Sequence, residues 1–223
     1  MLVGHFAIGL LGKRVAPAVS MGTLTLASML ADMLGFVLIL AGLEHWRVVS
    51  GGRGIDGVEL YDIGLSHSLL MDIVWGIVFA ALYRWRRRDN AGALMVFTAV
   101  VSHWVLDWIS HKPDMPLAPG TTAVYGLGMW TSFFWTVVVE GGLWLAALVI
   151  YGRMTRAKNR AGVYLFWAGI ALLTLSWISN LTASAPPAAQ SPTSGALVAL
   201  GFFSAMIAWA FWMNRLRPVH LRG

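Results

Sequence analysis

Residues 91–111 read AGALMVFTAVVSHWVLDWISH, an apolar run with one acidic residue and no lysine or arginine. A helix that crosses the hydrocarbon core of a bilayer needs about 20 mostly apolar residues, so this run is long enough to span a membrane. His103 and Asp107 are four residues apart, which places them on one side of a helix about one turn from each other. The run therefore predicts a membrane-spanning helix that carries polar groups on one face.

Five further runs of similar length and composition lie along the chain. The six predicted spans cover residues 18–43, 63–83, 91–111, 126–151, 161–182 and 194–214. Charged residues are 12% and apolar residues 58% of the chain, whereas soluble domains carry about 25% charged residues. A soluble globule of this size cannot hide so much apolar surface, and disordered chains are polar. We therefore expect an all-α polytopic membrane protein, a single transmembrane domain over residues 1–223 with about six transmembrane helices.

The connections between the predicted spans alternate in charge. Residues 13–14, 84–88, 153–160 and 215–222 are rich in lysine and arginine, whereas 44–62, 112–125 and 183–193 are acidic, mixed or uncharged. Because basic connections stay on the cytoplasmic side, this alternation predicts a cytoplasmic C-terminus. The same clusters suit the anionic surface of membrane lipids, so we expect no nucleic-acid partner.

The N-terminal stretch Met1–Gly12 is apolar but only about half as long as a span. Lys13 and Arg14 follow this stretch rather than precede it, so we do not expect a cleaved signal peptide. We expect a re-entrant or interfacial half-helix here. A re-entrant backbone needs protein or a wet cavity around it, and His5 reaches the bilayer interior only in that arrangement.

A small set of ionisable residues lies inside the predicted spans, where such groups are costly and usually mark a site or a pathway. The set comprises Asp32, His67, Asp72, His103, Asp107 and Glu140. The last two predicted spans carry no acidic residue and no histidine. We therefore expect the candidate site within residues 1–120 and scaffold helices within residues 126–223.

His103 and Asp107 give the sharpest local signal, because groups four residues apart on a helix can bind one cation together. With a rise of 1.5 Å per residue, several of the ionisable groups also fall at one depth in the membrane. The predicted metal ligands are His5, Asp32, His67, His103 and Asp107. The chain has no cysteine, and a site built of imidazole and carboxylate suits Zn and also Mn or Fe.

Two of the acidic residues do not fit this ligand set. Asp72 lies about 140° around the helix from His67 and so does not share its face. Glu140 is expected in the cytoplasmic half of the fourth span, as a general base, a proton-path residue or the partner of an arginine. For the whole set, hydrogen bonds that hold the helices together remain the structural alternative.

Three elements of the sequence occur in a recognisable order: Val3-Gly4-His5-Phe6, then GLSHSL at 64–69, then SHWVLD at 102–107, continued by HKPDMPL at 111–117. This pattern resembles the YdjM-like family of inner-membrane metal-dependent hydrolases, also described as LexA-regulated membrane proteins. The resemblance covers roughly residues 1–120. It implies a bacterial inner-membrane location and a metal site formed by the histidines and aspartates of these elements.

The sequence departs from this family at two places. Relatives often carry P-D-x-D in the first span, whereas residues 30–34 read LADML, so the second carboxylate is missing. Many relatives have Arg-Gly before the His-Ser pair, whereas residues 61–64 read YDIG. A site for two metals would lack ligands, so we expect one divalent metal ion.

If the protein is an enzyme, we expect a metal-activated water to hydrolyse an ester or phosphoester of a lipid or lipid-linked substrate. Asp107, Asp32 or Glu140 would accept the proton of the water. Polar groups around the ligands would orient them, and the candidates for this role are Ser66, Ser68, Ser102 and His111.

Two other functions use the same residues. One is a proton or metal-ion carrier or channel, in which the His/Asp cluster would be a relay or a transient site. The other is a structural membrane protein without catalysis. The spacing of His103 and Asp107 and the Ser-His-Ser element at 66–68 favour a fixed coordination site. The lack of a trail of polar residues through the last two spans, and of paired broken helices, counts against a carrier.

Overall fold

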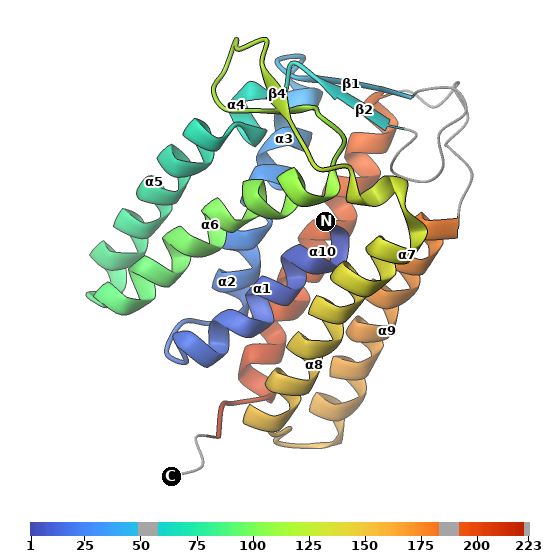
Figure 1. Cartoon of the computed structure of the whole chain (residues 1–223). Coiled ribbons are helices and arrows are strands. Elements are labelled where there is room, and N and C mark those ends of the chain that lie inside the picture. The colour runs from blue at the N-terminus through green and yellow to red at the C-terminus, as the bar shows by residue number, and fades with distance from the viewer. Residues whose placement is uncertain (49–57, 183–191, 221–223) are drawn as a thin grey trace.

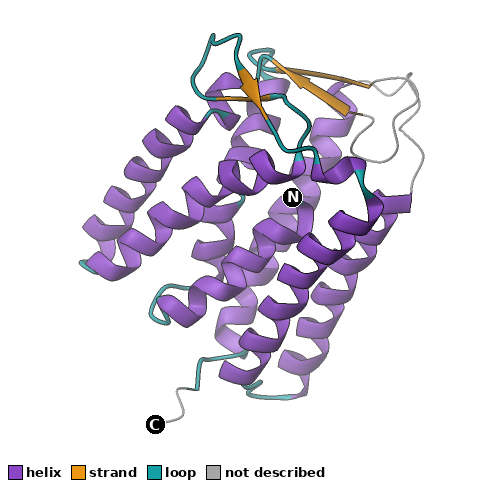
Figure 2. Cartoon of the chain, in the orientation of Figure 1, coloured by secondary structure: helices purple, strands orange, loops and turns teal. Residues whose placement is uncertain are grey.

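The computed structural model describes residues 1–48, 58–182 and 192–220. Long helices form one bundle, and two short antiparallel hairpins lie at one end of it (Figures 1 and 2). The hairpins pair β1 (His45–Val48) with β2 (Val58–Tyr61) and β3 (Met115–Pro116) with β4 (Val124–Tyr125). The expectation of an all-α polytopic membrane protein is confirmed.

The N-terminal half-helix, α1 (Leu2–Val15), lies inside the bundle rather than on its surface (Figure 1). It packs against α2 (Met21–Ser28), α6 (Asn90–Ser110) and α8 (Gly142–Met154). A Cβ at Gly9 would lie 2.7 Å from Thr25 Oγ1, so this glycine permits the close approach of α1 to α2. The half-helix is therefore surrounded by protein, as a re-entrant segment requires.

Lys13, which the charge pattern assigns to the membrane surface, is 4% exposed. Its ammonium group donates hydrogen bonds to the carbonyls of Pro17 at 2.7 Å and Val19 at 2.6 Å. A buried amine needs such acceptors, and these two lie in the turn that joins α1 to α2. Lys13 thus stabilises the turn that returns the chain from α1 toward α2.

The first predicted span, 18–43, is broken rather than continuous. α2 ends at Ser28 and α3 (Leu30–Leu40) begins at Leu30, so only Met29 separates them. The chain bends by 56° between the two helices. Taken together they are long and apolar enough to cross a membrane. The break leaves the last carbonyls of α2 without helical partners.

The second predicted span, 63–83, is also divided. A short helix, α4 (Gly64–His67), precedes α5 (Leu69–Arg87), because Ser68 has an extended backbone with φ −88° and ψ 147°. The Ser68 side chain accepts a hydrogen bond from the Met71 N–H and so begins α5. Arginines occupy the last turn of α5 and lower its apolarity.

Four helices within the described residues are long and apolar enough to span a membrane, or five if α2 and α3 count as one bent span. They are α6, the continuous segment Phe133–Met154, α9 (Arg160–Thr182) and α10 (Pro192–Leu216). The segment Phe133–Met154 comprises α7 (Phe133–Thr136), a π-helical turn η3 (Val137–Gly141) and α8, and follows the 3-10 turn η2 (Met129–Thr131). The second predicted span, 63–83, corresponds to α4 and α5, and α5 falls outside this count because of its charged residues.

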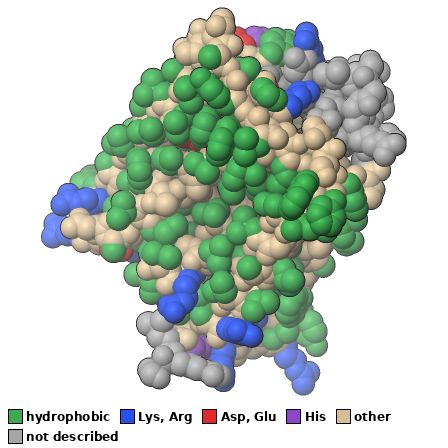
Figure 3. Space-filling model, viewed as in Figure 1, with side chains coloured by type: hydrophobic (Ala, Val, Ile, Leu, Met, Phe, Trp, Pro, Cys, Tyr) green, Lys and Arg blue, Asp and Glu red, His purple; other side chains and the backbone are tan. Residues whose placement is uncertain are grey.

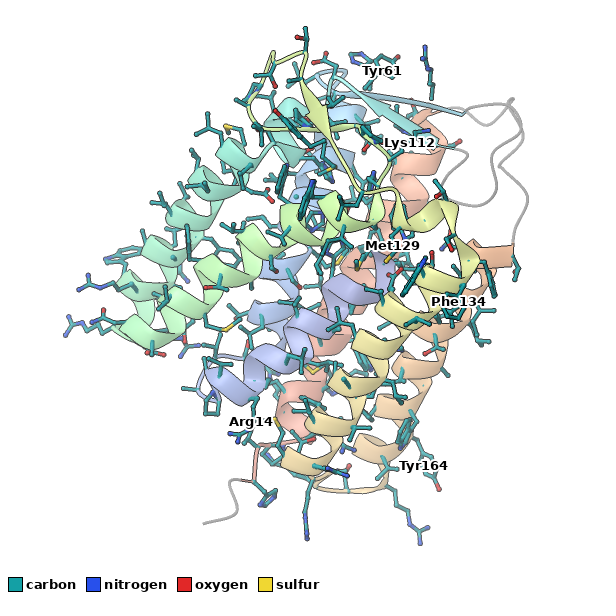
Figure 4. All side chains as sticks on the ribbon, viewed as in Figure 1. Arg14, Tyr61, Lys112, Met129, Phe134 and Tyr164 are labelled. Carbon is teal, nitrogen blue, oxygen red and sulfur yellow. The ribbon has the colours of Figure 1, made fainter. Side chains whose placement is uncertain are left out.

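The two ends of the bundle differ in charge. Figure 4 places Arg14 and Tyr164 at the end opposite Tyr61 and Lys112. The turns α1–α2, α5–α6 and α8–α9, which contain most of the basic clusters, lie away from the hairpins (Figure 1). Hydrophobic side chains cover the face between the two ends (Figure 3), as expected for helices solvated by lipid. The assignment of the basic end to the cytoplasm stays a prediction.

Candidate metal centre

α6 supplies the two central groups of the candidate site. The helix begins after Asp89, whose side chain accepts a hydrogen bond from the Gly92 N–H. His103 and Asp107 follow on its buried face and are 0% and 2% exposed. The distance from His103 Nε2 to Asp107 Oδ2 is 3.1 Å. The pair is therefore formed as its spacing predicts.

α1 brings His5 to the same place. His5 Nε2 lies 3.0 Å from Asp107 Oδ1, and the backbone nitrogen of Met1 also contacts this oxygen. The His5 and His103 rings are stacked, with centroids 3.8 Å apart and an interplanar angle of 6°. The half-helix therefore carries His5 into the cluster. From the sequence, this position is expected only if α1 is re-entrant.

α3 and α4 bring the remaining two predicted ligands. His67 Nε2 lies 3.4 Å from Asp32 Oδ1, and His103 Nε2 lies 3.8 Å from the same oxygen. A Cβ at Gly35 would lie 3.0 Å from the Cε1 of His67, so the glycine lets α3 approach this imidazole without displacing it. All five predicted ligands thus converge from four separate helices.

The break after α2 gives the His103 ring a hydrogen bond to the backbone. The Nδ1 atom of His103 lies 2.8 Å from the carbonyl oxygen of Ser28, the last residue of α2. This carbonyl is available because the last turn of a helix leaves its acceptors unpaired. The bond fixes the orientation of the imidazole, as the non-ligating nitrogen of a metal-binding histidine commonly does.

The five side chains form two overlapping groups with the geometry of a cation site. One group is His5, His103 and Asp107, and the other is Asp32, His67 and His103. In each group the candidate ligand atoms lie within 4.8 Å of one another. His103 belongs to both groups and is the centre of the cluster.

The cluster faces a cavity of about 830 Å³. The polar wall of this cavity contains His5, Asp32, His67, Asp107, His111 and Glu140. Trp177 of α9 and Phe202 and Phe203 of α10 are among the residues of its apolar wall. The helices expected to be scaffold therefore also line the cavity, because α1 is too short to separate them from the cluster.

Residues 1–185 match the model of a protein family described as YdjM inner membrane protein. The chain belongs to the YdjM inner membrane protein family. No curated protein and no solved structure matches it. The match extends beyond the 1–120 region where the sequence motifs lie and continues to the end of α9. The apolar helices agree with the inner-membrane description of the YdjM family.

In this YdjM-family chain Glu140 lies in the π-helical turn η3 and is 1% exposed. Its Oε1 accepts a hydrogen bond from the Gly4 N–H, and its Oε2 accepts one from Trp130 Nε1, both at 3.3 Å. Its described partners are thus not arginines. Because the helix begins only at Phe133, Glu140 lies at the level of the His/Asp cluster rather than in the opposite half of the span. π-helical turns often occur at functional sites, where they redirect a side chain.

The four residues expected to orient the ligands differ in their contacts. Ser66 Oγ lies 2.6 Å from His67 Nδ1, and His111 Nε2 lies 3.9 Å from Asp107 Oδ1. Ser68 and Ser102 instead donate to the carbonyls of Gly64 and Ala99 within their own helical segments. Among the described contacts these two serines therefore do not hold a histidine, since each hydroxyl is used by a nearby backbone carbonyl.

Asp72 is fully buried but belongs to neither ligand group. Its Oδ2 accepts a hydrogen bond from the Trp104 N–H at 3.1 Å, and its Oδ1 has no hydrogen-bond partner among the described residues. This agrees with the expectation that Asp72 does not share the face of His67. Asp72 lies between α5 and α6, where it contacts the backbone next to His103.

Two groups at the site carry no signal in the sequence. The Ser28 carbonyl is a backbone atom, so residue identity gives no indication of it. Glu44 is 1% exposed and lines the cavity, although it lies in a connection expected to be solvated. Its proximity to α4 follows from the path of the chain after α3, which hydrophobic periodicity does not report.

Proposed function

We propose that this YdjM-family chain is a membrane-embedded metal-dependent hydrolase that acts on an ester or phosphoester of a lipid or lipid-linked substrate. The observation that carries the proposal is the environment of His103 Nε2. This nitrogen is buried and has no hydrogen-bond partner among the described residues. It faces two carboxylates, Asp107 at 3.1 Å and Asp32 at 3.8 Å.

The hydrogen bond at the other ring nitrogen decides what His103 Nε2 presents to these carboxylates. A carbonyl oxygen only accepts, so His103 Nδ1 must donate its proton to Ser28 at 2.8 Å. In a neutral imidazole the other nitrogen then carries a lone pair. A lone pair that faces two carboxylates is unfavourable. A proton on Nε2 would relieve the conflict with one carboxylate, whereas a divalent cation among these groups would relieve it with both.

The distances in the cluster fit such a cation. Zinc with bonds of about 2.0–2.1 Å in tetrahedral geometry holds its ligand atoms about 3.3 Å apart. The neighbouring candidate ligand atoms are separated by 3.0, 3.1, 3.4 and 3.8 Å. Because His103 Nε2 is common to both groups and has one lone pair, the residues support one ion, with Zn favoured over Mn or Fe.

A bound divalent ion would supply Lewis-acid polarisation of the substrate oxygen and would lower the pKa of a coordinated water. Asp32 and Asp107 belong to the ligand groups, and two further carboxylates, Glu44 and Glu140, line the cavity. Both oxygens of Glu44 are bound by the turn that carries Ser66, which leaves Glu140. Glu140 is held by the Gly4 N–H and Trp130 Nε1. We assign to Glu140 the acceptance of a proton from the attacking water.

The shape and lining of the cavity support an amphipathic substrate. A volume of about 830 Å³ lies within the usual range for small-molecule sites, about 300–1,000 Å³. Polar groups gather on the wall formed by α1, α3 and α6, and aromatic residues of α9 and α10 form the other wall. A polar headgroup ester would lie at the cluster, and an acyl or polyprenyl chain would lie along the aromatic wall.

One observation favours a second candidate, a metal-ion or proton carrier. Broken helices at a membrane site are typical of secondary transporters, and the 56° bend between α2 and α3 lies beside Asp32. A carrier would use the same His/Asp cluster as a transient site. Transport and hydrolysis therefore have to be measured on the same preparation.

The test begins with elemental analysis of detergent-purified protein grown in metal-replete medium. We expect about one Zn per chain in the wild type and loss of the metal in His103→Ala and Asp107→Ala. His220→Ala is the matched control, because His220 is exposed outside the cluster. Absence of metal from a folded wild type would overturn the metal site.

The second step separates the two functions. The metal-loaded wild type is incubated with a panel of phospholipids and polyprenyl phosphates, and the released headgroup or phosphate is measured. Turnover that disappears in Glu140→Gln supports the hydrolase. Absence of turnover, together with metal flux into proteoliposomes, would replace the hydrolase by the carrier.

A further inference from the structure

Glu44 is a buried carboxylate that belongs to neither ligand group. Its Oε1 accepts hydrogen bonds from the backbone N–H groups of Leu65 at 2.9 Å and Ser66 at 2.8 Å. Its Oε2 accepts the hydroxyl proton of Ser66 at 2.5 Å. Both carboxylate oxygens are therefore directed at the turn that carries His67.

The bond to Glu44 determines how Ser66 meets His67. A serine hydroxyl has a single proton, and Ser66 uses it on Glu44. Toward His67 Nδ1, at 2.6 Å, the same oxygen can then only accept. A proton of His67 therefore lies on Nδ1, and in the neutral ring Nε2 presents a lone pair on the side of Asp32, 3.4 Å away.

We propose that Glu44 is a positioning residue that acts through Ser66 to fix His67 as the Nδ1–H tautomer. This inference rests on the proposed metal site, because only this tautomer offers His67 Nε2 to a cation beside Asp32. His103 is fixed in the same tautomer by the Ser28 carbonyl. Two independent acceptors thus direct both Nε2 atoms toward the same carboxylate, Asp32.

Glu44 also satisfies N–H groups in the first turn of α4, so a purely structural role must be separated from control of the tautomer. Glu44→Gln makes this separation with almost no change of shape. The amide oxygen of glutamine still accepts the backbone N–H groups, whereas its NH₂ must donate to Ser66 Oγ. Ser66 then donates to His67 Nδ1, which moves the His67 proton to Nε2 and blocks metal binding there.

The first measurement uses metal-free protein labelled with ¹⁵N-histidine, because ¹⁵N chemical shifts distinguish a protonated from an unprotonated ring nitrogen. We expect His67 to be protonated on Nδ1 in the wild type and on Nε2 in Glu44→Gln. The second measurement is zinc affinity by chelator competition, which we expect to fall about 10–100-fold in Glu44→Gln, as for other residues that orient metal ligands.

A double-mutant cycle tests whether Glu44 acts through Ser66. In a Ser66→Ala background the path from residue 44 to His67 is removed, so Glu44→Gln should have no further effect on zinc affinity. Ser68→Ala is the matched control, because Ser68 lies in the same turn but its hydroxyl donates to the Gly64 carbonyl. This variant should keep the His67 tautomer and the zinc affinity of the wild type, although α5 loses its N-terminal cap.

The outcomes are distinct. A folded Glu44→Gln variant that keeps the His67 proton on Nδ1 and the zinc affinity of the wild type would overturn the proposal. If Glu44→Gln does not fold, Ser66→Ala provides the test instead. A Ser66→Ala variant that keeps the wild-type His67 tautomer and zinc affinity would also overturn the proposal. A tautomer that changes as expected in a wild-type protein that binds no zinc would instead reject the proposed function and leave the control of His67 by Glu44 supported.

Discussion

The imidazoles of His5 and His103 lie face to face, 3.8 Å apart, in the centre of the bundle. One belongs to the short N-terminal helix and the other to a long helix that crosses the structure, and both place Nε2 near Asp107. The stack makes α1 part of the candidate site rather than a membrane-surface segment.

Substitution of His5 by alanine should lower zinc affinity by about 100-fold or more, since it removes a ligand rather than a group that orients one. Chelator competition on purified protein measures the change, and circular dichroism checks that the helices remain. Ile8→Ala is the control, because Ile8 is a partly buried residue of α1 that packs in an apolar cluster. Equal zinc affinity in His5→Ala and wild type would remove α1 from the metal site.

Glu140→Gln should lower kcat for the phosphoester or ester substrate by about 10²–10⁴-fold while the bound metal stays at the wild-type level, because the carboxylate acts as a proton acceptor and not as a ligand. Steady-state kinetics together with elemental analysis provide both values. Loss of the metal along with activity would instead assign Glu140 to the metal coordination.

Gly35→Ala should weaken metal binding and destabilise the protein by about 1–3 kcal/mol. The added methyl would lie 3.0 Å from His67 Cε1 and 3.1 Å from Ser66 Oγ, so both groups have to move. Gly201→Ala in α10 is the matched control, because a Cβ there meets nothing within 4 Å. Thermal unfolding and zinc competition should separate the two variants, and identical behaviour would contradict the close approach of α3.

Asp72→Asn should leave metal content unchanged and should preserve or raise the thermal stability. The asparagine oxygen still accepts from the Trp104 N–H, while a neutral amide replaces a buried carboxylate whose Oδ1 has no hydrogen-bond partner among the described residues. Differential scanning fluorimetry in detergent and elemental analysis are sufficient here. A loss of metal or of turnover would show that the acidic form of Asp72 contributes to function.

Reporter fusions test the orientation of the bundle. A reporter inserted after Lys158, in the basic α8–α9 connection, should behave as cytoplasmic, whereas one inserted after Gly120, beside the β3–β4 hairpin, should behave as external. Both positions are exposed. The reverse pattern would place the hairpin end of the bundle toward the cytoplasm.

Much of the candidate site is predictable from sequence because its signals are local. His103 and Asp107 are placed together by helical spacing alone, and the position of Asp32 and His67 within the bundle follows from their apolar surroundings. The contribution of α9 and α10 to the cavity is not predictable in this way. Their lining residues, such as Trp177 and Phe203, have the same composition as residues that face lipid.

By itself the sequence determined the membrane character, the separation of basic from non-basic connections, and the set of histidines and aspartates that lipid should exclude. Composition, run length and spacing along a helix are sufficient for these conclusions. The tertiary structure alone decided that α1 enters the bundle, that the Ser28 carbonyl binds His103, and that Glu44 holds Ser66. Each of these contacts joins segments far apart in the chain, and hydrogen bonds to backbone atoms or across a turn depend on the path of the chain rather than on local residue pattern.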